Sequence, residues 1–161
     1  MSLPNKNAIA LAGEFAVAAQ LMLLGYDASL TFGHTKSIDI LVSKPGGSMF
    51  RLECKTSKKA ERNEKLFGRT LAWTMSAKHE KIIDPTLFCS FVSIGNDNRS
   101  FRYFIVPSKV VARYVDVEHR HWMKHHPSAR GSDMRSFRIG LPKEQYSFET
   151  PLASTYEDTW F

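Results

Sequence analysis

Several large protein classes are excluded by what this chain of 161 residues lacks. It has only two cysteines, Cys54 and Cys89, too few for a disulfide scaffold and typical of a reducing compartment. It contains no glycine-rich phosphate-binding motif and no internal repeat. Its one long apolar run, residues 8–26, is interrupted by Glu14 and Gln20, which argues against a membrane span or a signal peptide. We therefore expect a cytoplasmic protein with no membrane partner.

The chain nevertheless has the composition of a folded domain. Hydrophobic residues make up 43% of it and charged residues 24%, enough for one core and a solvated surface. The formal net charge is +6, and most of the excess lies in residues 51–81 and 99–138. Such clustering favours a polyanionic partner. We expect a single domain over residues 1–161, with a core over about 7–115 and a basic C-terminal extension over about 116–161.

Hydrophobic periodicity and turn residues predict helices and strands in mixed order. Expected helices cover residues 7–24, 107–114 and 117–126. Expected strands cover residues 26–32, 38–42, 49–55, 87–94, 101–106 and 136–141. A helical or irregular segment is expected between the third and fourth strands. Turn residues at 44–48 predict an antiparallel hairpin, and the whole order predicts a mixed α/β fold with a central sheet flanked by helices.

Glu14 is the only charged residue between Lys6 and Asp27, on a helix that is otherwise almost wholly apolar. A helix that is apolar all round is normally buried, and a buried carboxylate is costly unless it is paired. Glu14 therefore needs a cationic partner, a metal, or a place at a helix edge. The alternative is an ordinary solvent-facing glutamate.

The predicted hairpin brings charged side chains together on one face. Pairing its apolar faces sets Asp39 opposite Glu53, with Lys55 one pleat further along. The register pairs Ile38 with Cys54, Ile40 with Leu52, and Val42 with Phe50. Two opposed carboxylates repel unless a cation lies between them, and such oxygen donors suit Mg²⁺ or Mn²⁺. The alternative is a surface face on which Lys55 simply neutralises both acids.

These residues also resemble a known family. Gly13-Glu14 on an N-terminal helix, the strand 38–42, and Leu52-Glu53-Cys54-Lys55-Thr56-Ser57 resemble the PD-(D/E)XK nuclease superfamily, which includes restriction endonucleases and Holliday-junction resolvases. The resemblance implies a restriction-endonuclease-like αβββαβ core. Ile38 stands where the motif has its proline.

The resemblance also implies roles for individual residues. Asp39, Glu53 and the Cys54 backbone carbonyl would bind Mg²⁺, for which Mn²⁺ can substitute. Lys55 would be the catalytic lysine, and Glu14 would ligate metal or position water. The implied activity is hydrolysis of phosphodiester bonds in duplex or branched DNA. A non-catalytic DNA-binding or regulatory module that retains the fold is the alternative.

Partner surfaces can be predicted only coarsely. The family implies a homodimer, for which the sequence offers the terminal aromatics Trp160 and Phe161 as exposed candidates. His121 and His125 could hold zinc from one helical face, although a basic lobe that contacts nucleic acid is the better interpretation. Basic residues that follow the third strand are predicted to contact DNA phosphates, the alternative being a solvated face. They are Lys58, Lys59, Arg62, Lys65 and Arg69.

Overall fold

The computed structural model describes residues 4–31, 38–142 and 146–161. The chain begins with α1 (Lys6–Leu23), and the side chain of Asn5 caps its N-terminus by accepting a hydrogen bond from Ala8 N at 2.8 Å. Gly25, at φ +86°, follows the end of the helix. Within the described residues, no helix is both long and apolar enough to cross a membrane.

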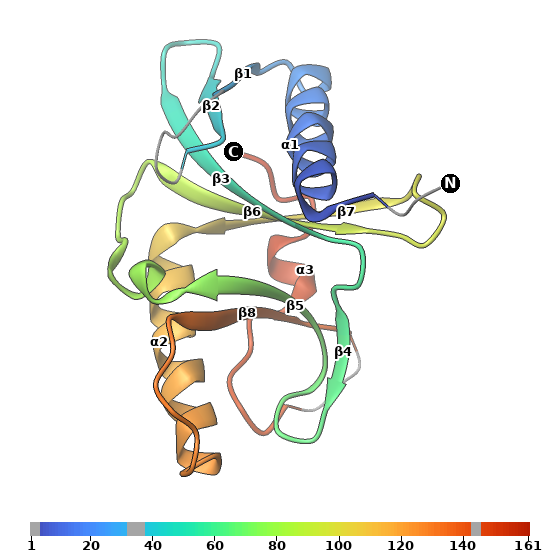
Figure 1. Ribbon diagram of the computed structural model, residues 1–161. Coiled ribbons are helices and arrows are strands. Elements are labelled where there is room, and N and C mark those ends of the chain that lie inside the picture. Colours follow the sequence, from blue (N-terminus) through green and yellow to red (C-terminus); the bar gives the residue numbers. More distant parts are fainter. Residues whose placement is uncertain (1–3, 32–37, 143–145) are drawn as a thin grey trace.

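A five-stranded mixed sheet forms the centre of the molecule, in the order β1-β2-β3-β6-β7 (Figure 1). Only β3 and β6 run parallel; the other neighbours are antiparallel. The strands are β1 (Asp27–Leu30), β2 (Ile40–Ser43), β3 (Met49–Ser57), β6 (Leu87–Ile94) and β7 (Phe101–Pro107). The expected mixed α/β class is confirmed. Residue 32 of the first expected strand lies outside the described residues.

The hairpin register is also confirmed, since Ile40 pairs with Leu52 and Val42 with Phe50. The ladder begins at Ile40, so Ile38 lies outside it. The turn closes with Lys44 N donating to Ser48 O at 2.8 Å.

The segment between β3 and β6 differs from expectation. Instead of a helical or irregular stretch it forms β4 (Glu61–Glu64), β5 (Gly68–Ser76) and a 3₁₀ turn, η1 (Ala77–Lys81). β5 also pairs with β8 (Met134–Gly140), which completes a second sheet in the order β4-β5-β8. The core side of β5 carries Leu71, Trp73 and Met75 at every second position, the period of a strand.

The two helices expected after β7 are one helix, α2 (Ser108–His125). Residues 115 and 116, which separate the two expected helices, are neither glycine nor proline and continue the helix. A short helix, α3 (Ala153–Tyr156), lies near the C-terminus.

The central sheet separates two apolar cores. On one face, α1 packs against β1 and β3, with its side chains Val17 and Leu21 in the core. On the other face, the second sheet and α2 pack against β6 and β7; Trp73 contributes to this core and donates from Nε1 to Val92 O at 2.9 Å. Cys54 and Cys89 are buried free thiols in strand interiors.

The terminal aromatics are half-buried against the central sheet and not fully exposed as expected. Phe161 stacks on Phe50 with ring centroids 4.7 Å apart, and its carbonyl accepts a hydrogen bond from the Tyr26 hydroxyl. Trp160 packs against Tyr103 at 5.5 Å. These contacts attach the chain end to the central sheet.

Candidate active site

The candidate site lies where β2 ends and β3 continues. β3 pairs with β6 as far as Ser57, but its ladder with β2 ends at Leu52. Asp39 stands at this fork, with its backbone N donating to Leu52 O at 2.8 Å. Its carboxylate reaches past the end of the ladder, where Oδ2 accepts a hydrogen bond from Cys54 N at 2.6 Å. A side chain thus takes the place of the missing strand partner.

The same fork exposes a backbone oxygen donor. In a strand the N–H and C=O of one residue point to the same edge. Because Cys54 N is directed to Asp39, the Cys54 carbonyl faces the same gap. The structure therefore places two of the three expected oxygen ligands at one edge.

Glu53 occupies the opposite face from Cys54 and is almost completely buried, with 3% of its surface exposed. Its Oε1 accepts from Lys55 Nζ at 2.7 Å, and Oε2 lies 3.0 Å from His79 Nε2. Burial by itself would raise the pKa of Glu53, but the hydrogen bond from His79 and the charge of Lys55 lower it to about 2. Glu53 is therefore ionised at neutral pH and is not part of a solvated surface face.

His79 is a member of this cluster that the sequence did not reveal. Its exposed fraction is 4%, and it lies in η1, 26 residues from Glu53 along the chain. Nδ1 lies 2.9 Å from Ser76 O and 3.2 Å from Ser76 N, while Nε2 lies 3.1 Å from Oε1 and 3.0 Å from Oε2 of Glu53. No local motif marks this residue, because its partner comes from another strand.

Close packing of α1 brings Glu14 to the fork. A Cβ on Gly13 would lie 1.8 Å from Thr56 Oγ1, so only glycine permits this approach of the helix to β3. Burial raises the pKa of Glu14, and the negative charge of Asp39 raises it further, while Lys55 opposes them. Glu14 is thus a partly buried carboxyl at the flank of its helix, in the electrostatic field of Asp39 and Lys55.

Asp39 and Lys55 complete one coupled set of charges. Burial raises the pKa of Asp39, although the hydrogen bond from Cys54 N and the charge of Lys55 both act to lower it. Burial would lower the pKa of Lys55, but the charge of Glu53, its hydrogen bond with Lys55 and the charge of Asp39 act together to raise the pKa. Asp39 and Lys55 therefore couple to each other and to both Glu14 and Glu53, and such perturbed charges are typical of functional sites.

The donor chemistry of this fork fits Mg²⁺. Within residues 4–31, 38–142 and 146–161, no three His, Cys, Asp or Glu side chains converge to hold a metal by themselves. Mg²⁺ needs fewer, because it is usually held by one or two carboxylates, with waters and substrate phosphates as its other ligands. Asp39 and the Cys54 carbonyl offer oxygen at the open edge. Glu53 has about four lone-pair positions, which its partners His79 and Lys55 do not exhaust.

A cationic groove of about 580 Å³ begins beside the site, at the end of β3. It runs between the start of α1 and the β3–β4 connection. Lysines and hydroxyl side chains line it, namely Lys6, Lys58, Lys59, Thr56, Ser57 and Thr74. These groups bind phosphate oxygens well.

The other basic residues predicted to contact DNA lie on the β4–β5 hairpin. Arg62 is on β4, Lys65 in the turn and Arg69 on β5, all exposed. Arg69 Nε donates to Glu61 Oε1 at 2.7 Å, which neutralises part of its charge. The structure thus arranges these residues along the segment that leaves the site.

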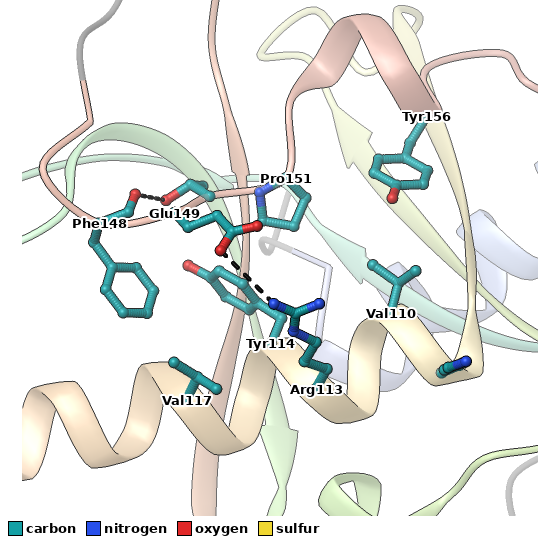
Figure 2. A pocket seen from close by; sticks show the side chains of 10 residues that line it. Val110, Arg113, Tyr114, Val117, Phe148, Glu149, Pro151 and Tyr156 are labelled. Atoms are coloured by element: carbon teal, nitrogen blue, oxygen red, sulfur yellow. Dashed lines mark hydrogen bonds and ion pairs between the residues drawn. The ribbon is translucent and has the colours of Figure 1, made fainter.

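Two other features are separate from this site. His125 Nδ1 lies 2.9 Å from the carbonyl oxygen of His121, one turn earlier on α2, so this nitrogen is occupied by backbone. A cavity of about 340 Å³ lies between α2 and the segment around Phe148 (Figure 2). It is lined by Tyr114 and Arg113, among others, and by none of the expected site residues.

Comparison with known proteins places the fold in a class. The chain is similar to the solved structure of a bacterial homing endonuclease, I-Ssp6803I, with a TM-score of 0.54. The match covers 98% of this chain and 90% of that one, at 11% sequence identity. No family model matches the sequence, and no curated protein matches it. The chain therefore has a nuclease-like mixed α/β fold.

Proposed function

We propose that this protein is a Mg²⁺-dependent DNA endonuclease of the PD-(D/E)XK type, acting as a homodimer. The observation that carries the proposal is the position of Asp39 at the fork of β2 and β3, where Asp39 and Lys55 couple electrostatically to both Glu14 and Glu53. The fold supports it, because a structure with the same overall arrangement is a homing endonuclease. The cationic groove at the end of β3, lined by Thr56 and Ser57 directly after Lys55 in sequence, supports DNA as the substrate.

Each residue then has a chemical task. Asp39, Glu53 and the Cys54 carbonyl would hold Mg²⁺, which when bound lowers the pKa of a water and stabilises charge on the phosphate. Lys55 is held by Glu53 and keeps 28% of its side chain exposed, so its remaining N–H groups can stabilise negative charge on the scissile phosphate. Glu14, whose pKa is raised by burial, would orient the attacking water.

The first experiment is cleavage of supercoiled plasmid, linear duplex, single strand and four-way junction in Mg²⁺, Mn²⁺ or EDTA. Wild type should cleave at least one DNA only with metal. Lys55→Ala should lose about 10²–10³-fold in rate while binding DNA normally, as expected for loss of one charge-stabilising donor. Lys109→Ala, which removes an exposed lysine on α2, is the matched control and should cleave like wild type. Equal rates in Lys55→Ala and wild type would contradict the proposal.

One observation favours a second candidate, a DNA-binding module that does not cleave. Both oxygens of Glu53 already have basic partners, and the described residues contain no complete three-ligand set. Salt-dependent binding of all four DNAs without cleavage in any metal would establish this alternative.

The DNA surface has its own test. Lys59 and Lys65 are exposed at the start and the turn of the β4–β5 hairpin. If each contacts a phosphate, the double variant Lys59→Ala/Lys65→Ala should reduce the slope of log Kd against log salt by about 2. Lys109→Ala is again the control. An unchanged slope would show that Lys59 and Lys65 do not contact DNA phosphates.

A further inference from the structure

The outer face of α1 is the most unusual surface of the molecule. The helix has a sheet on one side only and lies at the periphery (Figure 1). From Ala8 onward no exposed residue of the helix is polar or charged, although Lys6 and Asn7 in its first turn are, and seven of the exposed apolar residues lie together on its solvent side. They are Ala8, Leu11, Ala12, Phe15, Ala19, Met22 and Leu23, which together we call the α1 outer face. A surface helix normally carries polar residues there, so this face is built for burial.

We propose that the α1 outer face is a self-association surface, on which the α1 helices of two copies of this chain pair antiparallel. This proposal gives the homodimer a specific interface. It does not depend on catalysis, because assembly is measured without DNA.

Charge is the first reason to assign this face to a second copy. The chain has a formal net charge of +6, which would oppose association through most of its surface. The α1 outer face carries no charge, so two copies can meet there without bringing like charges into contact. A nucleic acid would find no cation on it.

The spacing of the side chains is the second reason. Residues 8, 12, 15, 19 and 22 are separated alternately by four and three positions. This spacing places them in one row along the helix, as in the contact row of two paired helices. An antiparallel pair centred on Phe15 sets Ala8 opposite Met22 and Leu11 opposite Ala19. Leu11 and Met22 then face alanines, the two Phe15 rings meet at the centre, and the helix dipoles oppose each other favourably. A parallel pair would set Leu11 against Leu11 and Met22 against Met22.

The area is the third reason. Leu11, Phe15, Met22 and Leu23 are 43%, 53%, 56% and 82% exposed. A second copy packed on this side would cover most of the exposed surface of these four side chains, a large apolar share of the about 800 Å² that each partner contributes to a standard interface.

Equilibrium sedimentation over a range of protein concentrations tests the surface. Wild type should be a dimer that dissociates on dilution, and Phe15→Glu should raise the dimer Kd at least 100-fold. Ile83→Glu is the matched control, because Ile83 is 65% exposed and lies in the connection before β6. Circular dichroism should show that both variants remain folded. A monomer at every concentration, or equal weakening by Ile83→Glu, would overturn the proposal.

Cysteine cross-linking tests the orientation, since the native thiols are buried. Under oxidation, Ala8→Cys/Met22→Cys should form intermolecular disulfides, whereas Ala8→Cys alone should not. Intermolecular disulfides in Ala8→Cys alone would mean a parallel pair and would overturn the antiparallel assignment. Flotation with neutral phosphatidylcholine vesicles tests a lipid partner. If wild type is monomeric and floats with the vesicles, and Phe15→Glu abolishes flotation, then the α1 outer face binds lipid and the proposal is wrong.

Discussion

Glu53 should make the stability of the folded protein depend strongly on pH. Its carboxylate is 3% exposed, and the hydrogen bond from His79 together with the charge of Lys55 overcomes burial and lowers its pKa from 4.5 to about 2. The difference between the two values corresponds to about 3 kcal/mol of stability. Because the folded pKa is the lower one, this stability is fully present above pH 4.5. It is lost as the pH falls towards 2.

The change to test is Glu53→Gln, which keeps the size of the side chain and removes its charge. Urea unfolding followed by fluorescence of the buried Trp73 gives the free energy of unfolding at each pH. Between pH 5 and pH 2, wild type should lose about 3 kcal/mol more than the variant. The raised pKa values of Glu14 and Asp39 act in the opposite direction, but both groups remain in both proteins.

The control is Glu149→Gln, whose carboxylate is 91% exposed and should leave the pH profile unchanged. Parallel profiles for wild type and Glu53→Gln would show that the contacts of Glu53 with His79 and Lys55 do not hold its charge in the folded protein. The account of the site as a coupled set of charges would then be refuted.

Substitutions at two further positions test the packing and polar contacts at the fork. Gly13→Ala should lower the free energy of unfolding, measured by thermal unfolding, by about 2 kcal/mol, because its Cβ would overlap Thr56. The control is Gly131→Ala, whose Cβ meets nothing within 4 Å and should lower the free energy of unfolding by less than about 0.5 kcal/mol. Asp39→Asn should stabilise the metal-free protein, because it removes a charge that burial disfavours and keeps an acceptor for Cys54 N. Asp39→Ala loses that hydrogen bond and should be about 1 kcal/mol less stable than Asp39→Asn. A reversed order of the two Asp39 variants would contradict this view of the fork.

Apolar alternation and turn residues in the sequence predict most strands of the central sheet, and they are the basis for choosing the candidate site residues. The alternation of apolar residues in β2 and β3 fixes the register, because a slip by one residue would expose every buried side chain. That register, with the turn at 44–48, is sufficient to place Asp39 beside β3 and to put Glu53 and Lys55 on one face. The close approach of Gly13 to Thr56 could not be predicted, since it depends on how the helix docks.

Long-range contacts explain what the sequence did not predict. His79 reaches Glu53 only because β5 and η1 fold back across the sheet. The charges within residues 58–69 obscured the strand period of the β4–β5 hairpin, although β5 buries every second residue. The terminal aromatics looked exposed because nothing near them in sequence could cover them; their partners Phe50 and Tyr103 come from distant strands.

The apolar composition of α1 is explained only when both sides of the helix are considered. Its sequence predicts a helix buried all round, yet the sheet covers only the side that carries Val17 and Leu21. Glu14, the single charged residue inside the helix, lies at the flank between these two sides and is directed to the fork. If the α1 outer face joins two copies, one 18-residue helix has three tasks: it packs on the sheet, places a carboxyl at the candidate site, and sets the distance between two such sites. Disrupting the outer face with Phe15→Glu should therefore leave each site intact while separating the pair. In a nuclease, that change converts paired cuts of both strands into single-strand nicks.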